Sequence, residues 1–343
     1  MKLRLISLLT AGAISLGASV SAKATELTFS SWAPATHTYM QYYLIPWMQE
    51  IEKASNGRIT IKLLPQPVAS APAHLDAVRD GLVDIAFIGM GYYPGRFELY
   101  ELTMMPFQAE SAEIRGVAFQ RTYDKFIAPK VDDFRDVKLL GSWAIGEGIL
   151  WTRNRTVDSP ETAKGAKVRI SGGVALKVGE AMGLVPLVKP ATEVYELLSG
   201  GIADGVLFPA EAICAFKLDE ILNGATRVPG GLYGDSTSVI INKDTYAALS
   251  DEDRAIIDKY SGEYLAMMGG RAVDGRDTEC WKQLNAKNMK VITADDKFQT
   301  FLRGLVDPMV ANWKAKAAAA GIDGEAAVSY YFEQIEELKK VKN

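Results

Sequence analysis

The chain has 343 residues, a formal net charge of −4 and no basic stripe, which argues against a nucleic-acid-binding protein. It contains two histidines, His37 and His74, and no cysteine pair at the spacing of metal ligands. These residues leave few ways to build a histidine-rich metal site or a serine–histidine–acid triad, so we expect neither a metal nor a cofactor.

The N-terminus has the pattern of a targeting signal. Lys2 and Arg4 precede an uncharged apolar run, Leu5–Val20, and small residues follow it. The run is short for a membrane span and lacks a stop-transfer pattern, so we interpret residues 1–24 as a signal peptide. No later stretch is long and apolar enough to cross a bilayer, and we therefore expect an exported, soluble protein.

The two cysteines, Cys214 and Cys280, lie far apart in the sequence. Export makes a disulfide between them chemically possible. The geometry of a disulfide is restrictive, however, and spacing in the sequence does not show that two residues meet. The sequence therefore leaves their pairing open, and unpaired thiols are the interpretation that we favour over a disulfide.

Apolar runs alternate with helical patterns in the first third of the chain, which predicts the α/β class. The run Asp84–Met90 is continuous, as in a strand covered on both faces. Gly89 and Gly91 lie at its carboxyl end, which is where ligands bind in open α/β sheets. The predicted elements are strands Glu26–Trp32, Arg58–Leu64 and Asp84–Met90, and helices His37–Ser55 and Ala71–Asp80.

A second set of alternating elements predicts a second lobe, because the chain is longer than one hydrophobic core usually organises. The stretches Ala77–Ile88 and Leu197–Phe208 share one plan: a helix end, a glycine, an aspartate three residues later and a buried strand. Two similarly built lobes would explain this plan, and a chance likeness is the alternative. The elements are strands Val168–Ser171, Leu184–Val188 and Asp204–Phe208, and helices Val174–Met182 and Thr192–Ser199.

The remaining elements are expected to connect the lobes. Two predicted strands between the lobes are long enough to cross from one to the other, and a later strand returns. Such connections predict a hinge that lets the lobes close on a ligand. The elements are strands Leu139–Trp143, Ile149–Arg153 and Ser236–Asn242, a helical region Asp251–Lys287 interrupted near Gly269 and Gly270, and tail helices Lys297–Lys316 and Gly324–Lys340.

Arg169 lies in the middle of the short apolar strand Lys167–Ser171. An unpaired arginine is costly to bury because its guanidinium group cannot lose its charge. On the pattern alone, two interpretations stay open. The side chain either points outward or pairs with an internal Asp or Glu, or its planar fork holds the carboxylate of a ligand.

Several short stretches matter by their order and spacing along the chain. They are His37, Asn56–Ile59, Gly81–Ala86, Ser159–Glu161, Gly165–Arg169, Glu193–Tyr195 and Gly201–Gly205. No single stretch is specific, but their combination resembles the extracytoplasmic solute-binding proteins of tripartite ATP-independent periplasmic (TRAP) transporters, the DctP-like family.

The resemblance implies a periplasmic-binding-protein-like fold, with two α/β lobes of mixed, mainly parallel sheets joined by crossing strands and a long bridging helix. We expect one lobe at residues 25–148 with 236–270, and the other at 149–235 with 271–343. The resemblance also implies that Arg169 holds the carboxylate of a ligand enclosed between the lobes. It further implies a periplasmic protein that delivers this ligand to a membrane permease, and we expect a monomer.

Three positions depart from the family pattern. Ile149 stands where a second arginine is frequent, Ala191 where an aromatic residue is frequent, and Phe208 where asparagine is frequent. The predicted pocket therefore keeps one carboxylate clamp and is otherwise apolar. This disfavours citrate-like and sugar-acid ligands, whose polar groups would lack partners. It favours a small organic monocarboxylate with an aromatic, aliphatic or onium-bearing body.

Other candidate ligand contacts are weaker. Trp32 and Trp143, at predicted strand ends, could stack on an aromatic ring, or hold an onium group beside Glu147 through cation–π contact. Core packing of each tryptophan and a solvated turn at Glu147 are the alternatives. Gly89 keeps its strand end open, and Tyr233 lies in a glycine-rich return loop.

Two other functions remain to be weighed against solute binding. An exported enzyme is disfavoured because the chain lacks GxSxG, HExxH and complete GxGxxG motifs, and no catalytic residue is predicted. A binding protein that presents its closed form to a receptor, as a ligand sensor, is not separated from a transport protein by the sequence.

Overall fold

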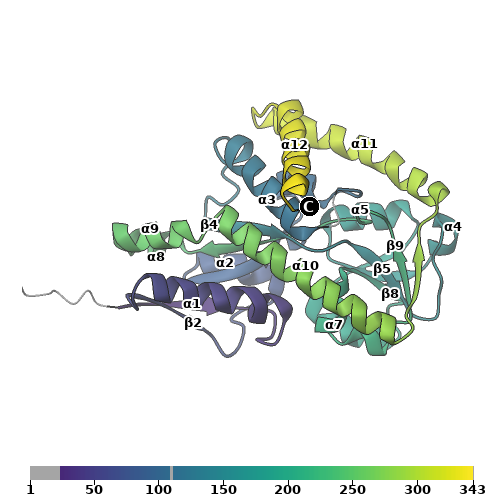
Figure 1. Ribbon diagram of the computed structural model, residues 1–343, viewed down its shortest axis with the longest axis horizontal. Coiled ribbons are helices and arrows are strands. Elements are labelled where there is room, and N and C mark those ends of the chain that lie inside the picture. Colours follow the sequence, from purple (N-terminus) through teal and green to yellow (C-terminus); the bar gives the residue numbers. More distant parts are fainter. Residues whose placement is uncertain (1–23, 109–110, 343) are drawn as a thin grey trace, which may run out of the picture.

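The computed structural model of the protein describes residues 24–108 and 111–342. The predicted signal peptide therefore lies outside the described residues, except for Ala24. The chain forms two α/β lobes, each with its own mixed sheet (Figure 1), as the sequence predicts. We call the lobe of the five-stranded sheet the first lobe and that of the six-stranded sheet the second lobe.

The first sheet has the order β2-β1-β3-β10-β4. Its first three strands are parallel, and β10 is antiparallel to both of its neighbours. β3 is buried nearly along its whole length, as expected for an apolar strand with layers on both faces. The strands are β1 (Thr25–Ser30), β2 (Ile59–Leu63), β3 (Ile85–Gly89), β4 (Lys138–Ala144) and β10 (Ser236–Ile241).

The second sheet has the order β11-β9-β5-β8-β6-β7. β6 is parallel to both β7 and β8, whereas β5 is antiparallel to β8 and β9. The strands are β5 (Ile149–Thr152), β6 (Lys167–Ile170), β7 (Val185–Val188), β8 (Gly205–Phe208), β9 (Gly224–Arg227) and β11 (Lys290–Thr293).

Helices cover the sheets and connect the lobes. The predicted helix at His37–Ser55 is present as a π-helical turn, Met40–Leu44, that leads into α1. The helices are α1 (Ile45–Ala54), α2 (His74–Arg79), α3 (Ala112–Thr122), α4 (Pro160–Ala163), α5 (Gly173–Ala181), α6 (Val194–Ser199), α7 (Ala210–Ala215), α8 (Lys243–Ala248), α9 (Asp251–Lys259), α10 (Glu263–Ala286), α11 (Asp296–Ala319) and α12 (Gly324–Lys342).

The shared plan of the two α/β units is a real structural repeat. Gly81 and Gly201 both adopt the left-handed conformation, with φ of +72° and +71°, which favours glycine. Asp84 then accepts a hydrogen bond from the backbone of Thr28 on the neighbouring strand, at 2.8 Å. Asp204 accepts the equivalent bond from Lys167, also at 2.8 Å. Each aspartate thus ties the start of its strand to the strand beside it.

The long helix α10 bridges the lobes, running from beside α9 in the first lobe to α7 in the second (Figure 1). The predicted interruption near Gly269 and Gly270 is wrong: α10 is continuous there, and the break lies before it, at Gly262. The two glycines instead permit close packing. A Cβ atom on Gly269 would lie 2.6 Å from the Trp143 ring, and one on Gly270 would lie 2.3 Å from Glu113 Cα.

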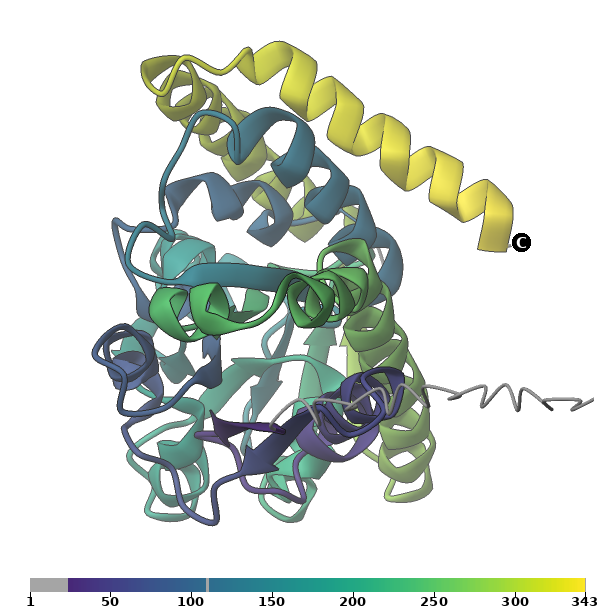
Figure 2. The same cartoon turned by 90° about the vertical axis from the view of Figure 1, so that its left-hand side faces the viewer.

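The lobes are joined by chain crossings and by the C-terminal helices. Residues 145–148 connect β4 to β5, and residues 228–235 connect β9 to β10. α11 contacts α5 in the second lobe, while its Trp313 donates a hydrogen bond to the Leu99 carbonyl, at 2.9 Å. α12 lies over α3 (Figure 2). Within the described ranges, no helix combines the length and apolarity needed to span a membrane.

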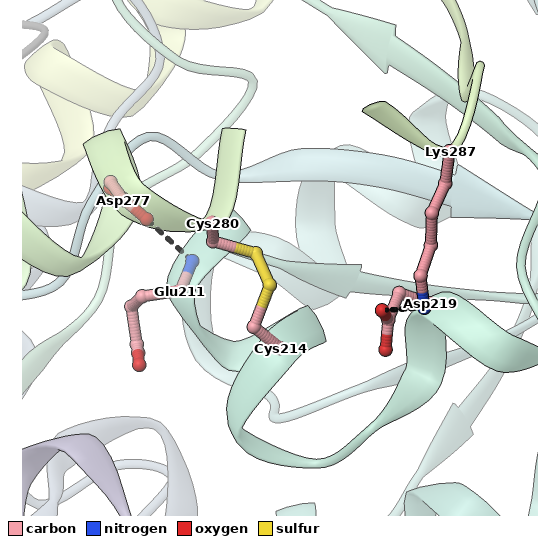
Figure 3. The surroundings of a disulfide bond; sticks show 6 residues. All are labelled: Glu211, Cys214, Asp219, Asp277, Cys280 and Lys287. Atoms are coloured by element: carbon pink, nitrogen blue, oxygen red, sulfur yellow. Dashed lines mark hydrogen bonds and ion pairs between the residues drawn. A yellow bond between two sulfur atoms is a disulfide. The ribbon is translucent and has the colours of Figure 1, made fainter. Parts of the chain in front are cut away.

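A disulfide joins Cys214 on α7 to Cys280 on α10 (Figure 3), with Cα atoms 5.9 Å apart. Our expectation of unpaired thiols is therefore wrong. The physical reason is that α7 packs directly against α10. Two residues separated by 66 positions in sequence thus become neighbours through a helix contact that spacing alone does not reveal.

Candidate functional site

A cavity of about 60 Å³ lies where the carboxyl ends of strands from both sheets meet. Gly89 ends β3, Arg169 is the third residue of β6 and Phe208 ends β8. This is the position at which open α/β sheets bind ligands. Six of the predicted site residues line the cavity: Trp32, Gly89, Arg169, Ala191, Phe208 and Tyr233.

Side chains with flat, delocalised groups surround this cavity. In the first lobe, the ring centroid of Trp32 lies 6.3 Å from that of His37 and 6.2 Å from that of Tyr92. In the second lobe, the Phe208 ring stacks on the Phe216 ring with centroids 5.7 Å apart. Both lobes thus contribute aromatic walls.

These walls join into a closed circuit of side chains through one contact within the second lobe and two contacts between the lobes. Arg169 Cζ lies 4.7 Å from the centroid of the Phe208 ring, and Arg169 Nη2 donates to the Tyr92 hydroxyl at 3.3 Å. Elsewhere in the cavity wall, the His37 and Phe216 ring centroids lie 5.1 Å apart, edge to face. A flat apolar ligand would therefore meet ring faces or edges from both lobes.

Arg169 is a buried cation that forms no ion pair with the described residues. Its side chain is buried, with the residue 1% exposed, so it does not point outward. Its Nε donates to the Lys189 carbonyl at 2.8 Å, and its other hydrogen bond goes to the neutral Tyr92 hydroxyl. Within the part of the chain that the structure describes, no carboxylate forms an ion pair with it. A buried charge of this kind requires a partner, and a ligand carboxylate would supply one.

Asp235 is a cavity residue that the sequence reasoning missed. Its Oδ2 accepts from Ser171 Oγ at 3.1 Å, and its Oδ1 accepts from the Ser236 backbone at 2.8 Å. Burial raises its pKa to about 6, although these hydrogen bonds and the Arg169 charge act in the opposite direction. Its only signal in the sequence is its place between a glycine-rich loop and the apolar strand of β10.

Glu211 is a second carboxyl group that the sequence reasoning missed. It lies in the first turn of α7, is 1% exposed and lines the cavity. Burial raises its pKa to about 7. The Thr38 and Tyr39 side chains approach it and partly offset this rise, but within the described residues no contact to either carboxyl oxygen reaches hydrogen-bond geometry.

His37 is a neutral aromatic wall in this cavity. Its Nδ1 accepts a hydrogen bond from the Tyr39 backbone at 3.2 Å, which places the proton of the neutral ring on Nε2. Burial lowers its pKa to about 4, so the ring stays uncharged at neutral pH. Among the residues that the structure describes, no cluster of three or more His, Cys, Asp or Glu side chains is arranged to hold a metal ion.

The structure places the other three predicted residues away from the cavity. Trp143 is buried behind it, where its ring centroid lies 4.8 Å from that of Tyr43. Glu147 accepts from Arg227 Nη2 at 2.5 Å and from the Gly230 backbone at 3.2 Å, so its carboxylate already has partners. Ile149 is buried in the second-lobe core, paired with Phe208 across the sheet.

This geometry has counterparts among known proteins. The sequence pattern described as "Bacterial extracellular solute-binding protein, family 7" matches residues 29–316. The chain belongs to this family. It is therefore a TRAP-type solute-binding protein, as its resemblance to the DctP-like family predicted.

Two solved structures and one curated relative illustrate the likeness. A TRAP periplasmic solute-binding protein from Bordetella bronchiseptica, with bound (R)- and (S)-mandelate, is 44% identical, with 92% of this chain and 99% of that chain covered and a TM-score of 0.90. A marine metagenome TRAP protein specific for aromatic acids, with 3-hydroxybenzoate, is 29% identical over 92% and 99% of the chains, with a TM-score of 0.84. The C4-dicarboxylate-binding periplasmic protein of Rhodobacter capsulatus is 24% identical over 92% and 96%.

Proposed function

We propose that this family member binds a small aromatic monocarboxylate in the interlobe cavity. The observation that carries the proposal is Arg169, a buried cation whose hydrogen bonds go only to neutral atoms in the described part of the chain. A planar carboxylate matches its guanidinium fork. The aromatic circuit around it favours a flat apolar body over a polyhydroxylated one, whose hydroxyl groups would lose their hydrogen bonds to water.

The likeness to solved structures supports this ligand class. The Bordetella protein binds mandelate and the marine protein binds 3-hydroxybenzoate, both aromatic monocarboxylates. The likeness to the C4-dicarboxylate-binding protein is weaker in identity. A dicarboxylate would also need a second cation, whereas the carboxyl groups of Glu211 and Asp235 line this cavity.

The rest of the proposal concerns the setting. We propose that the protein acts in the periplasm after removal of residues 1–24, as a monomeric binding protein rather than an enzyme. Closure of the lobes on the ligand would yield the form that a TRAP membrane permease accepts. A ligand can bias such a closure only through contacts that it makes better in the closed form. Arg169 and Tyr92, which hydrogen-bond across the lobes, would provide such contacts.

The experiment that tests the proposal is a ligand panel on protein that has been unfolded, freed of co-purified ligand and refolded. The panel holds benzoate, phenylacetate, mandelate, pyroglutamate, succinate, citrate and gluconate, with isothermal titration calorimetry on each compound that raises Tm. A ligand at about one hundred times its Kd should stabilise the fold by roughly 2.7 kcal/mol. We expect this for aromatic monocarboxylates. Binding restricted to succinate, citrate or gluconate would contradict the proposal.

A further inference from the structure

Glu211 is a buried carboxyl group of the cavity without a hydrogen-bond partner among the described residues. Its backbone N–H donates to Asp277 Oδ1 at 2.6 Å, which fixes the start of α7 against α10. Its side chain extends away from Asp277 (Figure 3) and lines the cavity. Within the described residues, both carboxyl oxygens are buried and accept no hydrogen bond.

Such a group is costly unless something in the cavity satisfies it. A buried carboxyl group without a hydrogen-bond partner loses its interactions with water and gains nothing in return. The groups that act on Glu211 from other elements are Thr38, Tyr39, Asp277 and Arg276. The Thr38 and Tyr39 side chains approach the carboxyl group and partly lower its pKa, but within the described chain no contact to its oxygens reaches hydrogen-bond geometry. A donor group on a bound ligand would supply such a partner.

The position of Glu211 separates it from the carboxylate clamp. Glu211 approaches Thr38 and Tyr39 of the first lobe, whereas Arg169 contacts Tyr92 and Lys189. A ligand held at Arg169 by its carboxylate would therefore reach Glu211 with a different part of its body.

Building on the proposed function, we propose that Glu211 selects aromatic monocarboxylates that carry a ring hydroxyl group. The ligand O–H donates a hydrogen bond to a Glu211 carboxyl oxygen, while Arg169 holds the ligand carboxylate. A hydroxyl group fits better than an ammonium group because it brings one donor to the carboxyl group, whereas an ammonium group would bring three donors and a full charge into a buried site.

The test compares hydroxylated and unsubstituted ligands in wild type, Glu211→Leu and Glu211→Gln. Calorimetry gives Kd for benzoate, 3-hydroxybenzoate and 4-hydroxybenzoate, and for phenylacetate and its two hydroxy counterparts. We expect wild type to bind at least one hydroxy acid about ten-fold more tightly than its parent acid. Glu211→Leu should abolish this preference, so that the ratio of the two Kd values falls to about one, whereas Glu211→Gln, which keeps a carbonyl acceptor, should retain part of it.

A ligand-side control requires no mutation. Methoxy analogues of the preferred acid keep the ring and the oxygen but lack the donor, so wild type should bind them no better than the parent acid. An unchanged preference in Glu211→Leu, equal binding of hydroxy and methoxy acids, or tighter binding of 4-(aminomethyl)benzoate would overturn the role of Glu211. These outcomes leave the proposed function intact, whereas a wild-type protein that binds no aromatic acid contradicts both.

Discussion

The two α/β units share one frame but place different chemistry on it. In the first unit, Ser30 of β1 lies opposite Ala86 of β3; in the second, Arg169 of β6 lies opposite Val206 of β8. Asp84 accepts a hydrogen bond from the backbone of Thr28, two residues before Ser30. Asp204 accepts one from the backbone of Lys167, two residues before Arg169, so Ser30 and Arg169 occupy equivalent positions. The repeat thus puts a small neutral side chain in one lobe and a cation in the other.

The equivalent positions also differ in how their polar groups are satisfied. Ser30 Oγ lies 3.0 Å from His74 Nε2 and accepts from the Val68 backbone at 3.1 Å. Arg169 has hydrogen bonds only to neutral acceptors, and its charge is left for something else to neutralise. The arrangement of strands and aspartates thus occurs in both units, but only the second unit places a cation, Arg169, at this position. The cation of the site therefore belongs to the second lobe, and a neutral serine holds the equivalent position in the first.

We expect the largest effect on ligand affinity from removing the Arg169 side chain, which distinguishes the second unit from the first. Arg169→Ala should leave the protein folded and weaken binding of benzoate by roughly a thousand-fold, because a charge-assisted, enclosed pair is lost. Calorimetry measures this loss. Arg79→Ala, which removes an exposed arginine of the first unit, is the control for net charge and should leave Kd unchanged. Equal affinities of the Arg169→Ala variant and wild type would show that Arg169 of the second unit does not hold the ligand carboxylate.

The second unit also has a covalent anchor, the disulfide between α7 and α10. Closing a loop between residues 66 positions apart should stabilise the fold by about 4 kcal/mol in the chain-entropy account. The double variant Cys214→Ala/Cys280→Ala should therefore lower the free energy of unfolding, measured in urea, by up to this amount. Wild type under reducing conditions should match the variant. An unaltered unfolding midpoint would mean that helix packing alone anchors α7.

The buried carboxyl groups of the second lobe should make stability depend on pH. Burial raises the pKa of Glu211 to about 7, above its value in the unfolded chain, so the folded state binds this proton more tightly. Its contribution is complete below about pH 4 and is lost as pH rises through about 7, by on the order of 2 kcal/mol. His37 acts in the opposite direction, since its pKa is lowered to about 4.

Comparison with Glu211→Gln isolates this contribution, because His37 is common to both proteins. Urea unfolding at pH 5 and pH 8 should show wild type losing more stability than the variant between the two values. Parallel losses in both proteins would argue against a raised pKa at Glu211.

The smallest expected effects are losses of stability when the equivalent aspartates of the two units, Asp84 and Asp204, are replaced. Asp84 accepts from the Thr28 backbone and from Thr245 Oγ, at 2.8 and 2.9 Å, whereas Asp204 has one backbone partner, Lys167. Asp84→Ala should therefore cost about 2 kcal/mol of stability and Asp204→Ala about 1 kcal/mol. Differential scanning calorimetry on ligand-free protein would measure both. A larger loss for Asp204→Ala would mean that the two frames are not held in the same way.

Much of the frame could be predicted because its signals are local. Apolar runs, helix patterns and glycine positions locate the strands, and the repeated glycine–aspartate plan indicates the two units. Arg169 also stands out locally, as a charge inside an apolar strand. The interruption of α10 was misplaced because Gly269 serves close packing against Trp143, and a glycine that permits packing looks the same in the sequence as one that breaks a helix.

The rest of the site depends on contacts between elements. Glu211 and Asp235 reach the cavity only because α7 and the return loop pack against the other lobe, so no pattern near either residue indicates the cavity. Trp143 lies at a predicted strand end, but its side chain is on the face of β4 that packs against Tyr43 and α10. The disulfide could not be predicted for the same reason, since only the contact of α7 with α10 brings its cysteines together.

A crystal structure of the refolded protein with benzoate would test the central claim most directly, because it locates the carboxylate relative to the two units. Our account predicts both carboxylate oxygens within about 3 Å of the Arg169 guanidinium nitrogens. The ring should lie within the circuit that Trp32, Tyr92, Phe208, Phe216 and His37 form. A benzoate bound in the cavity with its carboxylate turned to the first lobe, away from Arg169, would contradict it.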